Sequence, residues 1–205
     1  MKTINKIFLI TIGLTFILVS CSDVIEEEPS TFLAPESLTS ELGAEAVVKG
    51  AYQIFQNAGY FGRELLAQIE MKSEYANGRG SYLPVGDYDL DARNINRVDQ
   101  VWSILYSGIN RANVIISTFG DLNLPEDKKA QWIAEAKVLR ALHYFHIVRL
   151  FGAAPLRVEA ADDLNNLSAP KSSVNDIYDQ IIDDLTSAIN SGALPESYPV
   201  VDLGR

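Results

Sequence analysis

The sequence predicts an all-α fold. Five runs of residues carry apolar side chains at alternating steps of three and four, the spacing that places them on one side of a helix. One run spans about 27 residues from Pro125 to Phe151 without a glycine or a second proline, enough for a helix roughly 40 Å long. No useful stretch shows the period of two that a half-buried strand requires. With 205 residues, 47% of them hydrophobic, the chain can bury a substantial core.

Three helices are predicted before residue 120. The first runs from a cap at Thr39 or Ser40 to about Gln56. The second runs from about Arg63 to Tyr75, and the third from Arg97 to Phe119. The residues expected to face inward are Val47, Ala51 and Phe55 in the first helix, Leu65, Leu66 and Ile69 in the second, and Val98, Val101, Leu105, Ile109, Ala112, Ile116 and Phe119 in the third.

The run from Pro125 to Phe151 is expected to be the central helix. Proline suits the first helical position because its missing N–H would be unpaired there in any case. Arg149 in the last turn suits the negative end of the helix dipole, and Gly152 followed by Pro155 ends the helix. Apolar residues on several sides require neighbours on several faces. They include Trp132, Ala136, Leu139, Ile147 and Leu150 on one side, and Leu142, Tyr144, Phe145, Val148 and Phe151 on others.

The last predicted helix runs from Val174 to Ile189 and has the most regular apolar stripe of the chain. Ser173 is placed to cap it, Asp176 strengthens its first turn, and Gly192 ends it. Two long segments, 76–96 and 153–172, lack helical periodicity. Loops of this length within a domain are usually functional or disordered.

Composition excludes several classes of function. The net charge is −10 with only 17 basic residues, so no basic run exists that could hold the phosphates of a nucleic acid. The single cysteine rules out an internal disulfide framework. Neither GxGxxG nor GxxxxGK occurs, so no phosphate-binding loop and no cofactor are expected. No pair of carboxylates is singled out by its spacing, and we expect a protein that is not an enzyme.

The N-terminus predicts a lipoprotein signal peptide over residues 1–20. Two lysines precede an apolar run of about 13 residues, Ile7–Val19, which is the length of a signal-peptide core and short for a membrane span. The run ends in Leu-Val-Ser-Cys, which fits a bacterial lipobox, so Cys21 is the predicted lipidation site. The alternative is a secreted protein whose signal happens to contain a cysteine. Residues 21–36, with five acidic residues and two prolines, are interpreted as a tether between the lipid and the folded part.

The central stretch E135-A-K-V-L-R-A-L-H-Y-F-H-I-V-R-L-F-G-A-A-P-L156 resembles the signature helix of the SusD/RagB family of outer-membrane nutrient-binding lipoproteins. The lipobox, the W102-S-I-L-Y-S-G-I-N-R-A-N113 stretch and the V174-N-D-I-Y-D-Q-I-I-D-D-L185 stretch are similar to the family as well. The signature positions that match are Glu135, Ala136, Leu139, Arg140, Ala141, Tyr144, Phe145, Val148, Phe151, Gly152 and Pro155.

This resemblance implies a bundle of tetratricopeptide-like stacked helix pairs with long ligand-facing loops. It also implies an outer-membrane, lipid-anchored and surface-exposed protein that holds an oligosaccharide or peptide for a SusC-type TonB-dependent transporter. The acidic residues behind Cys21 resemble the surface-export signal of the family's hosts. Family members are more than twice as long, so residues 37–205 would be an incomplete N-terminal α-helical domain. A helical-repeat scaffold that contacts only proteins is the alternative.

The loop from Asn77 to Asp91, within the segment 76–96, is the predicted ligand site. It combines turn-forming glycines with aromatic, basic and acidic residues, a mixture that suits sugar rings because their apolar faces stack while their hydroxyls find donors and acceptors. The family resemblance also places part of the ligand site in this half of the chain. The other interpretation is that the tyrosines pin a long loop to the helices beneath it. The candidate contacts are Arg79, Tyr82, Asp87 and Tyr88.

One pattern in this loop resembles a metal site without completing it. Asp87, Asp89 and Asp91 open like an EF-hand, but the sixth position is Ala92 instead of glycine and the twelfth is Val98 instead of glutamate. A solvated acidic loop is favoured over an irregular cation site.

Two further pairs of polar residues lie on the predicted helices. His143 and His146 lie three apart on the central helix, without a third ligand at one-turn spacing, so hydrogen bonding in the core is expected instead of zinc. Asn110 and Asn113 are expected to be buried and to bond neighbouring backbone.

Overall fold

The computed structural model describes residues 40–73, 75–91, 95–161 and 168–197. They all belong to one of the two units into which the chain divides, Pro35–Arg205. The predicted signal peptide, the acidic tether, Cys21 and the Thr39 alternative for the first cap lie outside the described residues.

The prediction of an all-α fold is confirmed. In the described ranges the only strands are two short ones, β1 and β2, while the rest is helix and loop. With η for a 3-10 helix, the elements are α2 (Glu41–Gln53), η3 (Ile54–Gln56), α3 (Glu64–Met71), η4 (Gly80–Tyr82), α4 (Leu83–Gly86), α5 (Asn96–Thr118), η5 (Phe119–Asp121), α6 (Glu126–Phe151), β1 (Ala154–Pro155), β2 (Lys171–Ser172) and α7 (Val174–Asn190).

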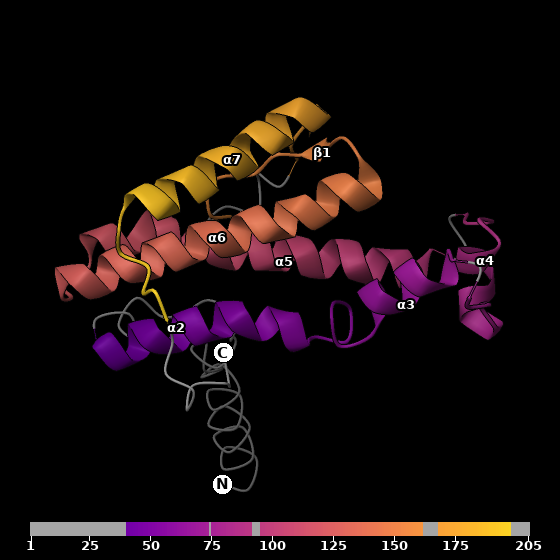
Figure 1. Cartoon of the computed structure of the whole chain (residues 1–205), viewed down its shortest axis with the longest axis horizontal. Helices are drawn as coiled ribbons and strands as arrows, with labels where there is room; N and C mark the ends of the chain where they lie inside the picture. Colours follow the sequence, from indigo (N-terminus) through magenta and orange to yellow (C-terminus); the bar gives the residue numbers. More distant parts are fainter. Residues whose placement is uncertain (1–39, 74, 92–94, 162–167, 198–205) are drawn as a thin grey trace, which may run out of the picture. The chain divides into compact units, whose positions relative to one another are not determined.

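Helices α2, α5, α6 and α7 lie side by side, each running opposite to the one before it (Figure 1). The most extensive packing is that of α6 on α7 and on α5, while α2 lies against both α5 and α6. Helix α6 is therefore central, as its apolar residues on several sides predicted. Within the described residues, no helix has both the length and the apolar character needed to cross a membrane.

Two hydrophobic clusters form the core, and α6 contributes to both. Tyr144 and Ile147 pack in the cluster with Ile177 of α7, whereas Trp132 and Leu139 pack in the cluster with α2. All five are nearly or fully buried. A fully buried side chain of this size contributes about 1.5–3 kcal/mol by leaving water, so α6 holds the layers on its two sides together.

Helices α5 and α6 approach closely at Gly108. A Cβ at this position would overlap the imidazole of His143. Glycine in the interior of a helix costs roughly 0.5–1 kcal/mol relative to alanine, and here it makes room for a ring on the facing helix. The pair thus fixes the register between the two longest helices.

The caps explain where the helices begin and end. The Ser40 side chain accepts a hydrogen bond from the Gly43 N–H at 3.1 Å and starts α2. Ser173 and Asp176 form a complete capping box on α7, as predicted. Gly152 ends α6 with φ at +71°, in the region that favours glycine. The chain then forms β1, which pairs with β2 antiparallel, Ala154 opposite Ser172, and closes the segment 153–172.

Two local predictions were wrong. Pro125 has an extended backbone and precedes α6, which begins at Glu126. Helix α3 is shorter than predicted, and it turns Leu66 and Ile69 outward, at 49% and 48% exposed. Only Leu65 of the three apolar residues is buried, because the buried face of α3 is shared with Glu64 and Gln68.

Candidate ligand-binding site

The predicted site residues lie in a small lobe, defined here as residues 75–91, at one end of the helical body beside α3 (Figure 1). The segment is more regular than predicted, since it contains η4 and α4. Its turns are tight: the backbone of Gly78 lies so close to Tyr82 that no Cβ fits between them. Gly86 approaches the carbonyl of Met71, where an added Cβ would lie at 3.4 Å. The lobe therefore packs against the end of α3.

Glu64 joins the lobe to the helices. Its carboxylate is fully buried, and one oxygen, Oε1, accepts three hydrogen bonds. Arg97 Nη1 donates at 2.7 Å, Arg63 Nε at 2.8 Å and the Tyr82 hydroxyl at 3.0 Å. Arg97 also lies over the Tyr82 ring, 4.4 Å from its centroid, and donates to Ser81 Oγ. Two cations stabilise the buried carboxylate, which could not remain charged alone.

The four predicted site residues differ in burial and in the hydrogen bonds that their side chains make. Tyr82 is half-buried and faces Glu64. Desolvation, followed by the hydrogen bond to the Glu64 carboxylate, raises the pKa of Tyr82. Arg79 and Asp87 are exposed. Tyr88 is 69% exposed, although its hydroxyl donates to the Lys72 carbonyl at 3.3 Å.

Tyr88 also has φ of +57°, which is unusual for a residue other than glycine. Such backbone strain occurs preferentially at functional sites. The hydrogen bonds of Tyr82 and Tyr88 match the interpretation that tyrosines pin the loop, while their remaining exposed surface stays available to a ligand. The assignment of these four residues to ligand binding stays a prediction.

A pocket of about 420 Å³ lies along α5, away from the lobe. Its volume falls in the range of small-molecule sites, about 300–1,000 Å³. The sequence did not single out this pocket, because its α5 residues look like an ordinary helix face and its other wall is contributed by residues about 50 positions later. It is lined by Trp102, Tyr106, Ile109, Asn110, Asn113, Pro155, Arg157, Glu159, Ala161, Ser168 and Ala169.

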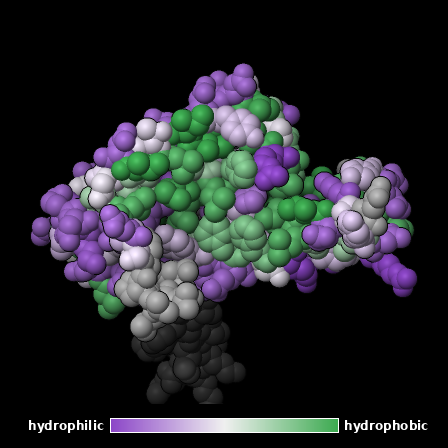
Figure 2. Space-filling view, in the orientation of Figure 1, coloured by the Kyte–Doolittle hydropathy of each residue, from purple (hydrophilic) through white to green (hydrophobic). Residues whose placement is uncertain are grey.

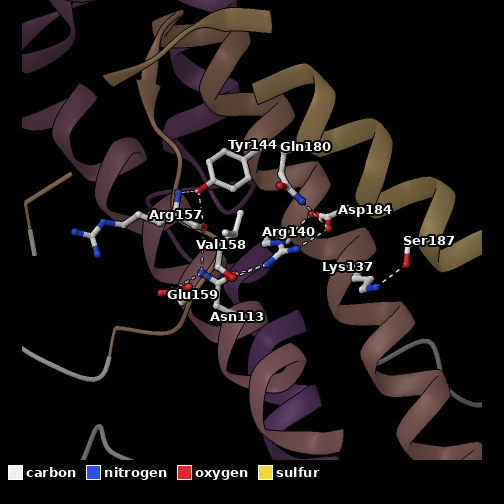
Figure 3. A network of polar contacts seen from close by, with 10 residues as sticks. All are labelled: Asn113, Lys137, Arg140, Tyr144, Arg157, Val158, Glu159, Gln180, Asp184 and Ser187. Atoms are coloured by element: carbon white, nitrogen blue, oxygen red, sulfur yellow. Dashed lines mark hydrogen bonds and ion pairs between the residues drawn. The ribbon is translucent and has the colours of Figure 1, made fainter. Parts of the chain in front are cut away.

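A buried polar network lies behind this pocket (Figure 3). Arg140 donates to both carboxylate oxygens of Asp184, at 2.8 and 2.6 Å, and also to Asn113 Oδ1 and the Val158 carbonyl. Asn113 Nδ2 donates to the carbonyls of Arg157 and Glu159 at 3.2 and 2.8 Å. The prediction that the asparagines bond backbone is confirmed, since Asn110 Oδ1 likewise accepts from the Ala161 N–H at 2.8 Å.

The expectation of hydrogen bonding was wrong for His143. Within the described part of the chain, neither ring nitrogen of buried His143 has a hydrogen-bond partner, and Nε2 of the partly buried His146 has none either. The rings instead pack in an aromatic cluster with Phe55, Tyr60 and Phe61. Among the described residues, no group of three or more His, Cys, Asp or Glu is placed to hold a metal ion.

Residues 25–202 match the family described as "Starch-binding associating with outer membrane". The chain belongs to this SusD-like family. The match extends over most of the chain and includes the helix that carries the signature resemblance. SusD-like protein P2 of Formosa agariphila is 34% identical over 192 residues, 89% of this chain and 37% of the relative. A SusD-like protein of Bacteroides ovatus is 26% identical and covers 93% of this chain and 36% of its own length.

Solved structures of SusD-like proteins share the helical arrangement. A laminarin-binding SusD-like protein is 26% identical, with a TM-score of 0.68 over 80% of this chain and 36% of the solved one. A SusD superfamily protein from Parabacteroides distasonis is 29% identical, with a TM-score of 0.62 over 75% of this chain and 34% of the solved one. This SusD-like chain thus spans less than two fifths of the relatives that it matches. The family and the tetratricopeptide-like helical fold are confirmed.

Proposed function

We propose that this chain takes part in nutrient uptake at the outer membrane by binding neutral oligosaccharides, without breaking a bond. Membership of the starch-binding, outer-membrane family carries this proposal. A solved relative at 26% identity binds laminarin, a glycan. The net charge of −10 disfavours polyanionic ligands, which leaves neutral glycans as the better class.

The proposed contacts are the exposed residues of the lobe. Tyr88 offers an aromatic surface on which the apolar face of a sugar ring stacks, while Arg79 and Asp87 offer donors and acceptors for its hydroxyls. Tyr82 adds the exposed part of its ring. Because Glu64 and Arg97 hold Tyr82 from behind, little ordering is required when the ligand binds.

The proposal includes a location and a partner. A lipid on Cys21 would anchor the chain to the outer membrane, with the acidic tether spanning the distance to the folded unit. A SusC-type TonB-dependent transporter is the proposed partner that receives the glycan. A peptide ligand remains the alternative within the same family. A pure protein-interaction scaffold is supported by one observation: α7 exposes a row of apolar residues at Tyr178, Ile182, Leu185 and Ile189.

Calorimetry with laminarihexaose, maltohexaose, a xyloglucan heptasaccharide and a mixed peptide pool tests the ligand class. We expect a neutral glycan to bind. Tyr88→Ala and Arg79→Ala should each weaken binding about fivefold, since each contact is worth about 1 kcal/mol. Tyr178→Ala, a partly exposed tyrosine on α7, is the matched control and should leave affinity unchanged. A heat of binding observed with the peptides but with none of the glycans would contradict the glycan assignment. Equal losses for Tyr88→Ala and Tyr178→Ala would contradict the site.

Affinity purification of the tagged protein from its native membranes tests the partner. We expect a transporter barrel to be recovered in stoichiometric amount. Recovery of soluble proteins without a barrel would favour the scaffold alternative.

A further inference from the structure

The pocket along α5 lies on a different part of the molecule from the predicted ligand lobe. Helix α5 forms one wall, from Trp102 to Asn113, and the segment after β1, residues 155–161, forms the other. Figure 2 shows apolar surface interrupted by polar residues over the helical body in the orientation of Figure 1. None of the lobe residues 75–91 lines the pocket.

Hydrogen bonds hold the second wall in place, so the pocket is preformed. The Tyr106 hydroxyl donates to the Pro155 carbonyl at 2.7 Å. The Tyr144 hydroxyl donates to the Arg157 carbonyl at 2.7 Å. Together with the bonds from Asn113 and Asn110 described above, four side chains of α5 and α6 fix the backbone of residues 155–161. A wall fixed at so many points does not collapse onto α5.

The pocket joins an aromatic surface to a polar rim. The rings of Trp102 and Tyr106 lie 4.8 Å apart, and Phe151 supports Trp102 edge-on at 5.0 Å. Both pocket rings are only partly buried. On the rim, Glu159 and Ser168 are exposed.

Asn110 adds a donor to this rim. Its oxygen is occupied by Ala161, which leaves its –NH₂ group without a partner among the described residues. A sugar ring has the complementary pattern, with an apolar face to stack and a hydroxyl edge that both donates and accepts.

We propose that this pocket is a second glycan subsite, which takes one or two neutral sugar rings with the ring face on Trp102 and Tyr106. Glu159 accepts from the hydroxyls, and the Asn110 amide donates to them. This inference rests on the proposed glycan-binding function, but it assigns a different surface from the lobe. The lining holds one cationic residue, Arg157, and one carboxylate, Glu159, so no net charge of the lining selects an anionic sugar over a neutral one.

The chain contains an internal reporter for this subsite. It has two tryptophans: Trp102 lines the pocket, whereas Trp132 is 3% exposed in the other core cluster, edge-on to Phe119. In a Trp132→Phe variant of the full chain, emission therefore comes from Trp102 alone. Acrylamide should quench Trp102 in the free protein. Adding the hexasaccharides used for calorimetry should shift its emission and protect it from acrylamide. Circular dichroism and a melting curve check that the variant is folded.

Variants of Glu159 on the rim and of Trp102 in the aromatic surface test the proposal further. Glu159→Ala should weaken the affinity read from Trp102 emission about threefold to tenfold. Asp179→Ala, which removes an exposed carboxylate from α7, is the matched control and should change nothing. In a chain that keeps Trp132, Trp102→Leu should abolish the change in emission on adding glycan. It should also remove a stacking contact with the sugar, so the affinity for long glycans should fall more than the affinity for short ones.

Each outcome decides the proposal. A calorimetric glycan signal that depends on Tyr88 but leaves Trp102 emission unchanged would overturn the second subsite while the proposed function stands. Absence of any glycan binding would overturn both. If Trp102 resists acrylamide in the free protein, another segment fills the pocket and the proposal fails. An emission shift with peptides alone would overturn the sugar assignment.

Discussion

His143 is a buried base that has no hydrogen-bond partner among the residues that the structure describes. Its ring is fully buried, and burial, with a smaller contribution from His146, lowers its pKa to about 3. The groups that face it are the rings of Phe55 and Tyr60, His146 one turn along the same helix, and the backbone of Gly108. None of them offers a negative charge that would stabilise an imidazolium, so the folded form keeps the ring neutral.

Acidification should therefore destabilise the fold through His143. Between its ordinary pKa of 6.5 and the lowered value of about 3, the unfolded chain binds a proton that the folded chain does not. The stability that the neutral His143 ring contributes is thus fully present above pH 6.5 and is lost as the pH falls through this range. At about pH 4.5 the loss from this residue is roughly 2–3 kcal/mol, at about 1.4 kcal/mol per pH unit. Urea unfolding at pH 7.5 and 4.5 should show a smaller difference for His143→Leu than for the unmodified chain.

His146 provides the comparison for this experiment. Burial, followed by the charge of Arg149, also lowers the pKa of His146, but the ring is only partly buried. His146→Leu should reduce the pH dependence less than His143→Leu does. An unchanged pH dependence in His143→Leu would show that the ring is protonated in the folded protein.

At the scale of the elements, Arg140 and Asp184 join α6 to α7. Their side chains are 6% and 1% exposed, and the closest N–O distance is 2.6 Å. Gln180 Nε2 donates to Asp184 Oδ1 at 3.1 Å, so the carboxylate is well satisfied. A buried pair of this kind need not add stability over apolar residues, but breaking it leaves an uncompensated charge.

Arg140→Met should cost about 3–5 kcal/mol in the free energy of unfolding, because Asp184 remains buried without its cation. The double variant Arg140→Met/Asp184→Leu should recover most of this loss. Chemical denaturation of the two single variants and the double variant measures the coupling between them. Additive losses in the double variant would mean that the pair does not act as a unit.

The sequence predicted the long helices well and α3 poorly, for one physical reason. Helices α5 and α6 bury many apolar residues along their length, so local periodicity reflects their packing. Helix α7 buries Ile177, Ile181 and Ala188 but leaves other apolar residues exposed. Helix α3 has few residues, and its buried face is decided by partners far along the chain. Arg97 pairs with Glu64, and the Arg97 carbonyl accepts from Gln68 Nε2 at 2.7 Å. No local pattern shows that Glu64 will be inside and Leu66 outside.

The two candidate binding surfaces also differ in how well they could be predicted from the sequence. Arg79, Asp87 and Tyr88 were singled out because polar and aromatic residues in a long segment without helical periodicity are visible in the sequence, and their part in ligand binding stays a prediction. The α5 pocket was missed because its walls meet only in three dimensions: Asn110 bonds Ala161, 51 positions later, and Asn113 bonds Glu159, 46 positions later. The W102–N113 resemblance marked this helix, but it could not show which segment lies across from it.

At the scale of the whole molecule, the proposed lipid anchor would determine where any binding surface can act. The evidence for it is in the sequence: the chain has one cysteine, and it directly follows an apolar run of signal-peptide length. A chain with net charge −10 is repelled by anionic membrane surfaces, so charge alone would not hold it there. The family is described as associating with the outer membrane, and acylation at Cys21 is the means of attachment that we propose.

Cys21→Ala should abolish this attachment without changing the folded unit. Growth with an alkynyl fatty acid, followed by click detection, should label the unmodified protein and leave the variant unlabelled. Each buried CH₂ of an acyl chain contributes about 0.8 kcal/mol to membrane binding, so a multiply acylated cysteine holds the protein firmly. The unmodified protein should pellet with outer membranes and the variant should remain soluble, with the same melting temperature. Equal labelling of both proteins would rule out Cys21 as the acylated residue. If the unlabelled variant still pelleted with the membranes, the polypeptide and not a lipid would be responsible for the attachment.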